Sequence, residues 1–105
     1  MRPGSYDAKV ATLRAEAATR HAIYPQYDGL FDCWVLALVV RDWQGKGHSV
    51  FTIGEIVLVN PVPSIMTEGG PSQFSAYCPA TGNVCSLDNA DIRFIAVTRY
   101  AEVST

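Results

Sequence analysis

The chain has 105 residues, of which 49% are apolar and 17% charged, and its formal net charge is −2. This length suits one domain, 1–105, with a single hydrophobic core, and the composition argues against a disordered chain. Because the charge is close to neutral, the chain has no basic field that would attract nucleic acid, and we do not expect nucleic acid as a partner.

Targeting and metal-binding signals are also missing from the sequence. The N-terminus lacks the basic start and apolar run of a signal peptide, and the longest apolar run, 34–40, is too short to cross a bilayer. Cys33, Cys78 and Cys85 form neither a disulfide framework nor paired zinc ligands. We therefore expect a cytoplasmic protein with reduced cysteines, no metal, no other cofactor and no contact with a membrane.

Residues 5–22 predict a helix that is rich in alanine. Its larger apolar side chains form one narrow stripe, at Tyr6, Val10, Leu13 and Ala17. A helix with so small an apolar stripe is marginal alone, so we expect it to dock onto the rest of the domain, which is a sheet over 31–100.

Residues 31–43 predict a strand that is apolar on both faces. One face carries Cys33, Val35, Ala37 and Val39, and the other carries Trp34, Leu36, Leu38 and Val40. One face would enter the core of a sheet or barrel, and the other would be covered by the helix or by a second subunit. The sequence QGKGH at 44–48 predicts a hairpin connection to the next strand.

The apolar residues of 51–58 change phase at Gly54. A bulge at Gly54-Glu55 would let Phe51, Ile53, Ile56 and Leu58 face one core. The alternative is a turn at Gly54, with a strand that begins at Glu55. The two interpretations are equally well supported, and both start a strand near Glu55.

Three short strands follow a long loop. Prolines and glycines in 60–72 predict a mobile loop that carries Ile65 and Met66. Strands are predicted at 73–78, 83–87 and 92–100. The sequence PATG at 79–82 predicts a four-residue hairpin loop with Cys78 opposite Asn83 and Cys85 on the diagonal, and DNAD at 88–91 predicts a tight turn.

The order of these elements resembles that of SH3-like small β-barrels, in which a long loop follows the first strand and a short helical turn precedes the last. The resemblance covers 51–97 and depends on IGEIVLV and TGNVCSLDNADIRFI. It implies that the helix and the strand at 31–43 are additions to the barrel. The predicted fold is α+β, mainly β: an N-terminal helix packed on a bent, mainly antiparallel, five-stranded SH3-like barrel. A flatter sheet with the helix on one face is the alternative.

A narrower likeness concerns GEIVLVNPVP, which is similar to the first strand of MazF-type endoribonuclease toxins. Those toxins carry an arginine-proline pair at the start of the next strand, where this chain has Gly70-Pro71-Ser72-Gln73 and no arginine. No motif pairs His21 or His48 with a cysteine, as nucleophilic catalysis would need. We therefore expect no enzyme, with a MazF-like endoribonuclease as the alternative.

The aromatic residues favour a binding function, because aromatic side chains at barrel edges often form peptide-binding or stacking surfaces. Phe74 and Tyr77 have opposite parity, which predicts that one faces outward. We expect a small non-enzymatic interaction or regulatory module that binds a protein partner. We also expect it to self-associate as a homodimer, through the faces of the strand at 31–43 or the neighbouring aromatic residues. A single-stranded nucleic-acid binder is a further alternative. The candidate binding residues are Trp34, Leu38, Trp43, Ile65, Met66 and Tyr77.

Overall fold

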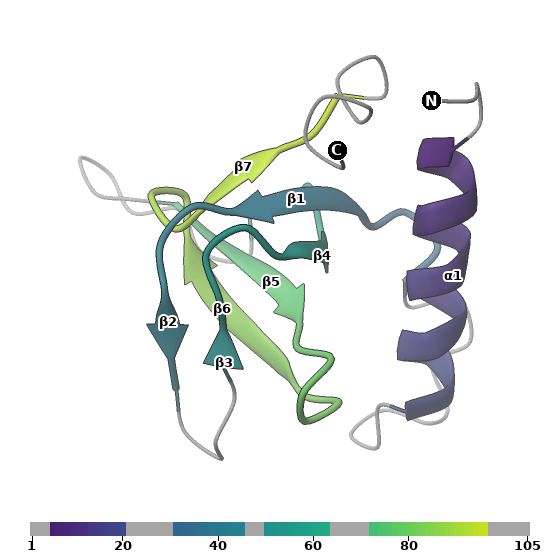
Figure 1. Ribbon diagram of the computed structural model, residues 1–105, viewed down its shortest axis with the longest axis horizontal. Helices are drawn as coiled ribbons and strands as arrows, with labels where there is room; N and C mark the ends of the chain where they lie inside the picture. Colours follow the sequence, from purple (N-terminus) through teal and green to yellow (C-terminus); the bar gives the residue numbers. More distant parts are fainter. Residues whose placement is uncertain (1–4, 21–30, 46–49, 64–71, 97–105) are drawn as a thin grey trace.

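The structure, a computed structural model, describes residues 5–20, 31–45, 50–63 and 72–96. One N-terminal helix lies beside a mainly antiparallel sheet, so the predicted α+β, mainly β class is confirmed (Figure 1). The elements are α1 (Ser5–Arg20), β1 (Val35–Val39), β2 (Trp43–Gln44), β3 (Val50–Phe51), β4 (Ile56–Val59), β5 (Gln73–Tyr77), β6 (Val84–Asp88) and β7 (Ile92–Phe94).

The main sheet has five strands in the order β6-β5-β4-β1-β7, and β2 and β3 form a separate two-stranded sheet. Among the described strands, β6 and β7 each pair on one side only. The prediction of a closed barrel is therefore wrong, and the sheet is open. It still curls strongly, because the rings of Phe74 on β5 and Phe94 on β7 touch, with centroids 5.1 Å apart, although β4 and β1 lie between these strands.

Strand β1 is the centre of the sheet and not an addition to it, which corrects the placement of the strand predicted at 31–43. It pairs antiparallel with β4, with Leu36 opposite Leu58, and with β7, with Leu38 opposite Arg93. The strand is shorter than predicted because residues 31–33 form a turn, in which the Trp34 amide donates to the Phe31 carbonyl.

Both faces of the sheet are covered, as the apolar pattern of β1 predicts. The helix-side core lies between α1 and the outer face of the sheet, and the inner core lies within its curl. The buried members of the helix-side core are Val10, Leu13, Ala17, Phe31, Trp34, Leu36, Leu58, Tyr77 and Ile95. Those of the inner core are Ala37, Val39, Phe51, Val57, Val59, Phe74, Ala76, Cys78, Leu87 and Ile92.

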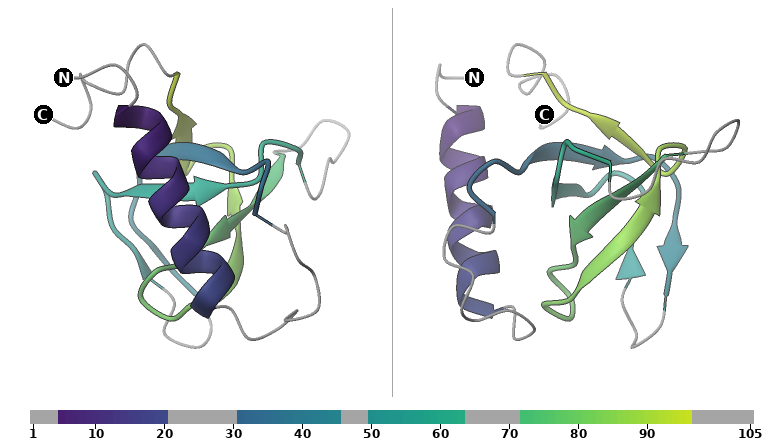
Figure 2. Two further views of the ribbon diagram at one scale, coloured as in Figure 1. Left: turned by 90° about the vertical axis from the view of Figure 1, so that its right-hand side faces the viewer. Right: turned by 180° about the vertical axis from the view of Figure 1, so that it is seen from behind.

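The predicted stripe of α1 is the face that packs on the sheet. Val10, Leu13 and Ala17 are buried there, and Tyr6 packs at the edge of the same core. Figure 2 shows the helix running along one side of the sheet, across the strand ends. The sequence allowed either the helix or a second subunit to cover the face of β1 that carries Leu36. Because α1 covers this face, a second subunit is not needed there.

Gly54 forms both a turn and a bulge, so the two interpretations of this position hold together. The Glu55 amide donates to the Thr52 carbonyl, and Gly54 has φ of 90°, as the third residue of a type II turn requires. The Gly54 amide donates to the Val39 carbonyl, while the Val39 amide donates to the Glu55 carbonyl. Gly54 and Glu55 thus both lie opposite Val39. Because Gly54 is in the left-handed conformation, this arrangement is a G1 bulge.

The consequence drawn from the bulge was wrong, however. Phe51 lies in the inner core, whereas Ile56 and Leu58 belong to the helix-side core and Ile53 is 59% exposed. Residues 51–58 do not form one strand whose apolar face changes at the turn. Instead the turn joins two short strands, β3 and β4, that belong to different sheets.

The last two connections are as predicted. The Cys78 amide donates to the Asn83 carbonyl and Gly82 has φ of 77°, so PATG is a four-residue hairpin loop. Cys85 faces Ala76 and is diagonal to Cys78. The 88–91 turn is closed by the Asp91 amide, which donates to the Asp88 carbonyl.

Candidate interaction surface

The described candidate binding residues do not form one exposed surface. Trp34 and Tyr77 are interior residues, 4% and 0% exposed, and Leu38 is half-buried beside them in the helix-side core. Trp43 lies apart from them, half-buried against Phe51 of the inner core. Ile65 and Met66, with most of the predicted mobile loop, lie outside the described residues.

The apolar faces of β1 are also not open to a partner. Leu36 and Ala37 are fully buried on opposite sides of the sheet. Phe74 and Tyr77 likewise point to opposite cores and are both buried, so the prediction that one of them faces outward was wrong. Alternation along a strand separates two faces, but it does not tell whether either face meets water.

Among the described strands, the sheet leaves its two edges open. On β7, Ile95 donates its amide to Leu36 and Asp91 accepts from the Val40 amide, so the residues that bond to β1 are Asp91, Arg93 and Ile95. The backbone groups of Ile92, Phe94 and Ala96 therefore point away from β1. No strand among the described residues pairs with that side.

An aromatic ring lies beside this edge. Phe94 is 41% exposed, and its ring packs edge-on against the buried ring of Phe74. Ile92 next to it is buried in the inner core. Arg93 projects from the opposite face and is exposed. The outer edge of β7 thus combines unpaired backbone groups with an anchored aromatic surface and a positive charge.

The other exposed large apolar side chains belong to segments of the chain outside β7. Val50 and Ile53 are exposed on the segment between β2 and β4, and Val62 follows β4. The ring of Trp43 lies over Gly45, where a side chain would collide with it. The ring is therefore partly covered by its own hairpin.

Three carboxylates near the strand ends accept hydrogen bonds from backbone amides. Asp42 accepts from the Ile53 amide at 2.8 Å, Glu55 from the Thr52 amide at 3.4 Å and Asp91 from the Asp88 amide at 3.1 Å. Within the described parts of the chain, no group of three or more His, Cys, Asp or Glu residues is arranged to hold a metal ion. These carboxylates accept hydrogen bonds from backbone amides of this chain.

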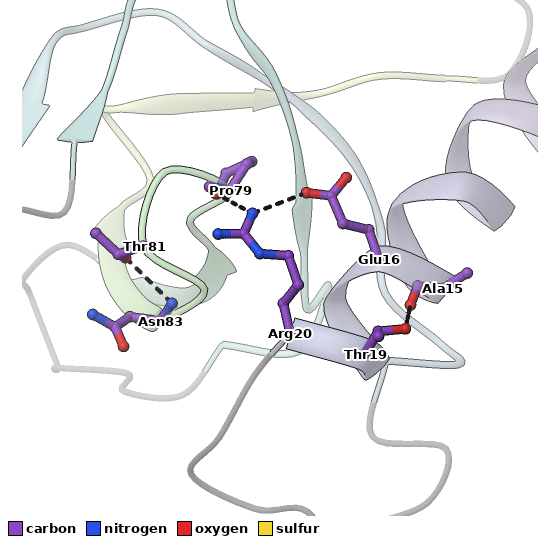
Figure 3. A network of polar contacts seen from close by, with 7 residues as sticks. All are labelled: Ala15, Glu16, Thr19, Arg20, Pro79, Thr81 and Asn83. Carbon is purple, nitrogen blue, oxygen red and sulfur yellow. Dashed lines mark hydrogen bonds and ion pairs between the residues drawn. The ribbon is translucent and has the colours of Figure 1, made fainter.

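A polar junction joins the end of α1 to the β5–β6 loop (Figure 3). Arg20 donates to the Pro79 carbonyl and to Glu16, and the Thr81 hydroxyl accepts from the Asn83 amide. Beside this junction the Tyr77 hydroxyl is buried, and no described residue, Arg20 included, meets it in full hydrogen-bond geometry. Burial raises the pKa of Tyr77, and the positive charge of Arg20 opposes that rise only in part.

Sequence reasoning did not find Phe94, because the position of a strand in a sheet depends on pairing between distant segments. The local signal was Arg93, a charged residue inside an apolar run, since charged side chains often mark edge strands.

Comparison with known proteins found no match: no protein-family model, curated protein sequence or solved structure is significantly similar to this chain. In the described part of the chain, no helix has the length and apolar character needed to span a membrane.

Proposed function

We propose that this protein is a non-enzymatic interaction module that binds an extended segment of a partner protein along the outer edge of β7. The observation that carries the proposal is the coincidence, on one edge, of outward backbone groups at Ile92, Phe94 and Ala96 with the half-exposed ring of Phe94. A peptide added there would become the next antiparallel or parallel strand of the sheet.

The two features would have different roles in binding. Backbone hydrogen bonds give affinity that is largely independent of the peptide sequence, whereas side-chain surfaces give selectivity. The Phe94 ring is held in place by Phe74, so it offers a fixed apolar surface with little loss of side-chain entropy. A peptide with an apolar or aromatic residue next to Phe94 is the ligand that this edge favours.

The SH3-like resemblance is part of the same proposal, with β1 and not β4 as its first strand. Support comes from the excursion through β2 and β3 that follows β1, and from the tight turn at 88–91 that precedes β7. The last described strand also returns to pair with β1. The open sheet departs from the closed barrel that the resemblance implies.

Selection from a phage-displayed library of random peptides tests the proposal, with amide exchange as the structural readout. Selected peptides should protect the amides of Ile92 and Phe94 from exchange. Ala96→Pro removes an outward N–H without touching a bond to β1 and should weaken binding, as should Phe94→Thr, which removes the ring. Val62→Thr, at an exposed apolar position away from β7, is the matched control and should bind as the unaltered protein does.

Selection of no peptide above background would contradict the proposal, as would peptides that bind the Ala96→Pro and Phe94→Thr variants unchanged. The same protein should be titrated with labelled single-stranded RNA at several salt concentrations. Cleavage of the RNA would favour the MazF-like alternative, and binding that falls steeply with salt would favour a nucleic-acid binder.

A further inference from the structure

We infer that a second copy of this chain pairs with the opposite edge of the sheet, joining β6 to β6 about a two-fold axis at Cys85. This inference does not depend on the peptide-binding proposal, because it concerns the other end of the strand order. It is offered in place of the homodimer expected through the 31–43 strand, where Leu36, Ala37 and Val39 are buried within one chain.

The free groups on β6 follow from its pairing with β5. The Cys78 amide bonds to Asn83 and the Asn89 amide to Ser72, so alternate residues of the strand, including Cys85 and Leu87, bond to β5. The backbone groups of Val84, Ser86 and Asp88 therefore point away from β5. Of these, Asp88 is already occupied: its amide donates to the Asp91 carboxylate and its carbonyl accepts from the Asp91 amide.

Only Val84 and Ser86 remain to pair with another strand, and this restricts the register. If Ser86 faced Ser86 of the second copy, Val84 would face Asp88, whose groups are taken. If Val84 faced Val84, Ser86 would face Gly82, whose amide already donates to the Cys78 carbonyl. Only the antiparallel register that sets Val84 opposite Ser86, and Ser86 opposite Val84, uses all the free groups of both chains.

This register is symmetric, and it puts Cys85 opposite Cys85. A two-fold axis places the same surface on both partners, so one favourable pairing is made twice. The two cysteines would form a non-hydrogen-bonded pair, in which Cα atoms lie about 4.5 Å apart. That separation falls within the range of about 4.4–6.8 Å that a disulfide needs.

The side chains of this edge do not oppose pairing. Val84, Cys85 and Ser86 carry no charge, and the stretch contains no proline, lysine or bulge, which are the usual devices that block edge-to-edge association. Edge strand β7 differs, because Arg93 lies at its centre. Of the two edges that the described strands leave open, β6 is the one suited to a second copy of the chain.

Light scattering over a dilution series, in a Cys33→Ser background, tests the interface. The mass should rise with concentration from 11.4 kDa for one chain toward twice that value. Ser86→Pro removes an outward N–H and should hold the protein at the single-chain mass, whereas Ser86→Ala should dimerise normally. Circular dichroism checks that the proline variant keeps its fold, and Ser86→Lys, which places a charge on the edge, is the second variant if it does not.

Cross-linking with 4,4′-dithiodipyridine tests the register. One Cys85 thiolate attacks the reagent and releases a thiopyridone, and the partner's Cys85 thiolate then displaces the second thiopyridone to form the disulfide. We expect a Cys85–Cys85 dimer that Cys85→Ser abolishes and Ser86→Pro slows at least tenfold. A single-chain mass at every concentration would overturn the inference, and so would a dimer that survives Ser86→Pro or yields no Cys85 cross-link.

Discussion

The hydroxyl of Tyr6, at the start of α1, accepts a hydrogen bond from the amide of Leu36 on the central strand at 3.2 Å. Tyr77 carries the same group into the same core, but its hydroxyl forms no hydrogen bond of good geometry with the described residues. The two tyrosines therefore form a matched pair in which deletion of one oxygen should have different effects.

Tyr6→Phe should lower the free energy of unfolding by about 1–3 kcal/mol, because the Leu36 amide loses its partner. Tyr77→Phe should cost nothing, or stabilise slightly, because it removes a buried polar atom that makes no well-formed hydrogen bond to the described residues. Urea unfolding of the two variants measures the difference. Equal losses would mean that the Tyr77 hydroxyl has a partner after all.

Arg14, in the middle of α1, forms hydrogen bonds to the turn before β1. Its Nε and Nη2 both donate to the Trp34 carbonyl, at 3.0 and 2.6 Å. Arg14→Met keeps most of the apolar stem and should lower the free energy of unfolding by about 1–3 kcal/mol. Lys9→Met removes the same charge from the same helix and should have a smaller effect. If the two variants lose equal stability, charge and not the carbonyl contact is responsible.

Gly54 should resist substitution because of its backbone conformation alone. No atom lies within 4 Å of the position that a Cβ would take, yet φ is 90°. Gly54→Ala should therefore lower the free energy of unfolding by about 1–2 kcal/mol, and Gly54→Asn by less, since asparagine tolerates this region better. Thermal unfolding of the two variants tests the order, and an alanine variant as stable as the original protein would contradict it.

The three reduced cysteines should react with a thiol reagent at different rates. Cys33 is exposed, Cys85 half-buried and Cys78 buried. In the native protein the Cys33 thiol should react in a fast phase and the Cys78 thiol in a slow phase. After denaturation without reductant, the reagent should detect three thiols per chain. One thiol in that last measurement would indicate a disulfide and a different β5–β6 loop.

The raised pKa of Tyr77 predicts a loss of stability in alkali. The folded chain keeps the phenolic proton at pH values where the unfolded chain releases it, so this contribution is complete below about pH 10 and falls as pH rises through the folded-state pKa. Tyr77→Phe should flatten the decline in stability above about pH 10. Unfolding in urea on both sides of that pH gives the slopes, and identical slopes would be the contrary result.

The elements that depend on neighbouring residues were predictable from the sequence. The stripe of α1, the PATG loop with its glycine and the turn at 88–91 each follow from a few adjacent side chains. The two-faced pattern of β1 also predicted that both of its faces would be covered. Sheet closure and strand order were not predictable in this way, because they depend on which distant segments pair.

The candidate site shows the same limit. Trp34 and Tyr77 have the residue types of a binding surface, but α1 and the curl of the sheet enclose them. Phe94 has the same chemistry and is half-exposed, and among the described strands β7 has a neighbour on one side only. Residue type was informative about these aromatic side chains, whereas their accessibility was decided by tertiary structure.

The central position of β1 also has a kinetic consequence. Val35–Val39 hydrogen-bonds to Ile56–Val59 and to Ile92–Phe94, the last strand described, so the middle of the sheet is completed by a late segment of the chain. Contacts between such distant segments close large loops before they gain stability, and they slow folding. The helix and the β5–β6 hairpin can form early, but the cooperative step should wait for β7 to reach β1.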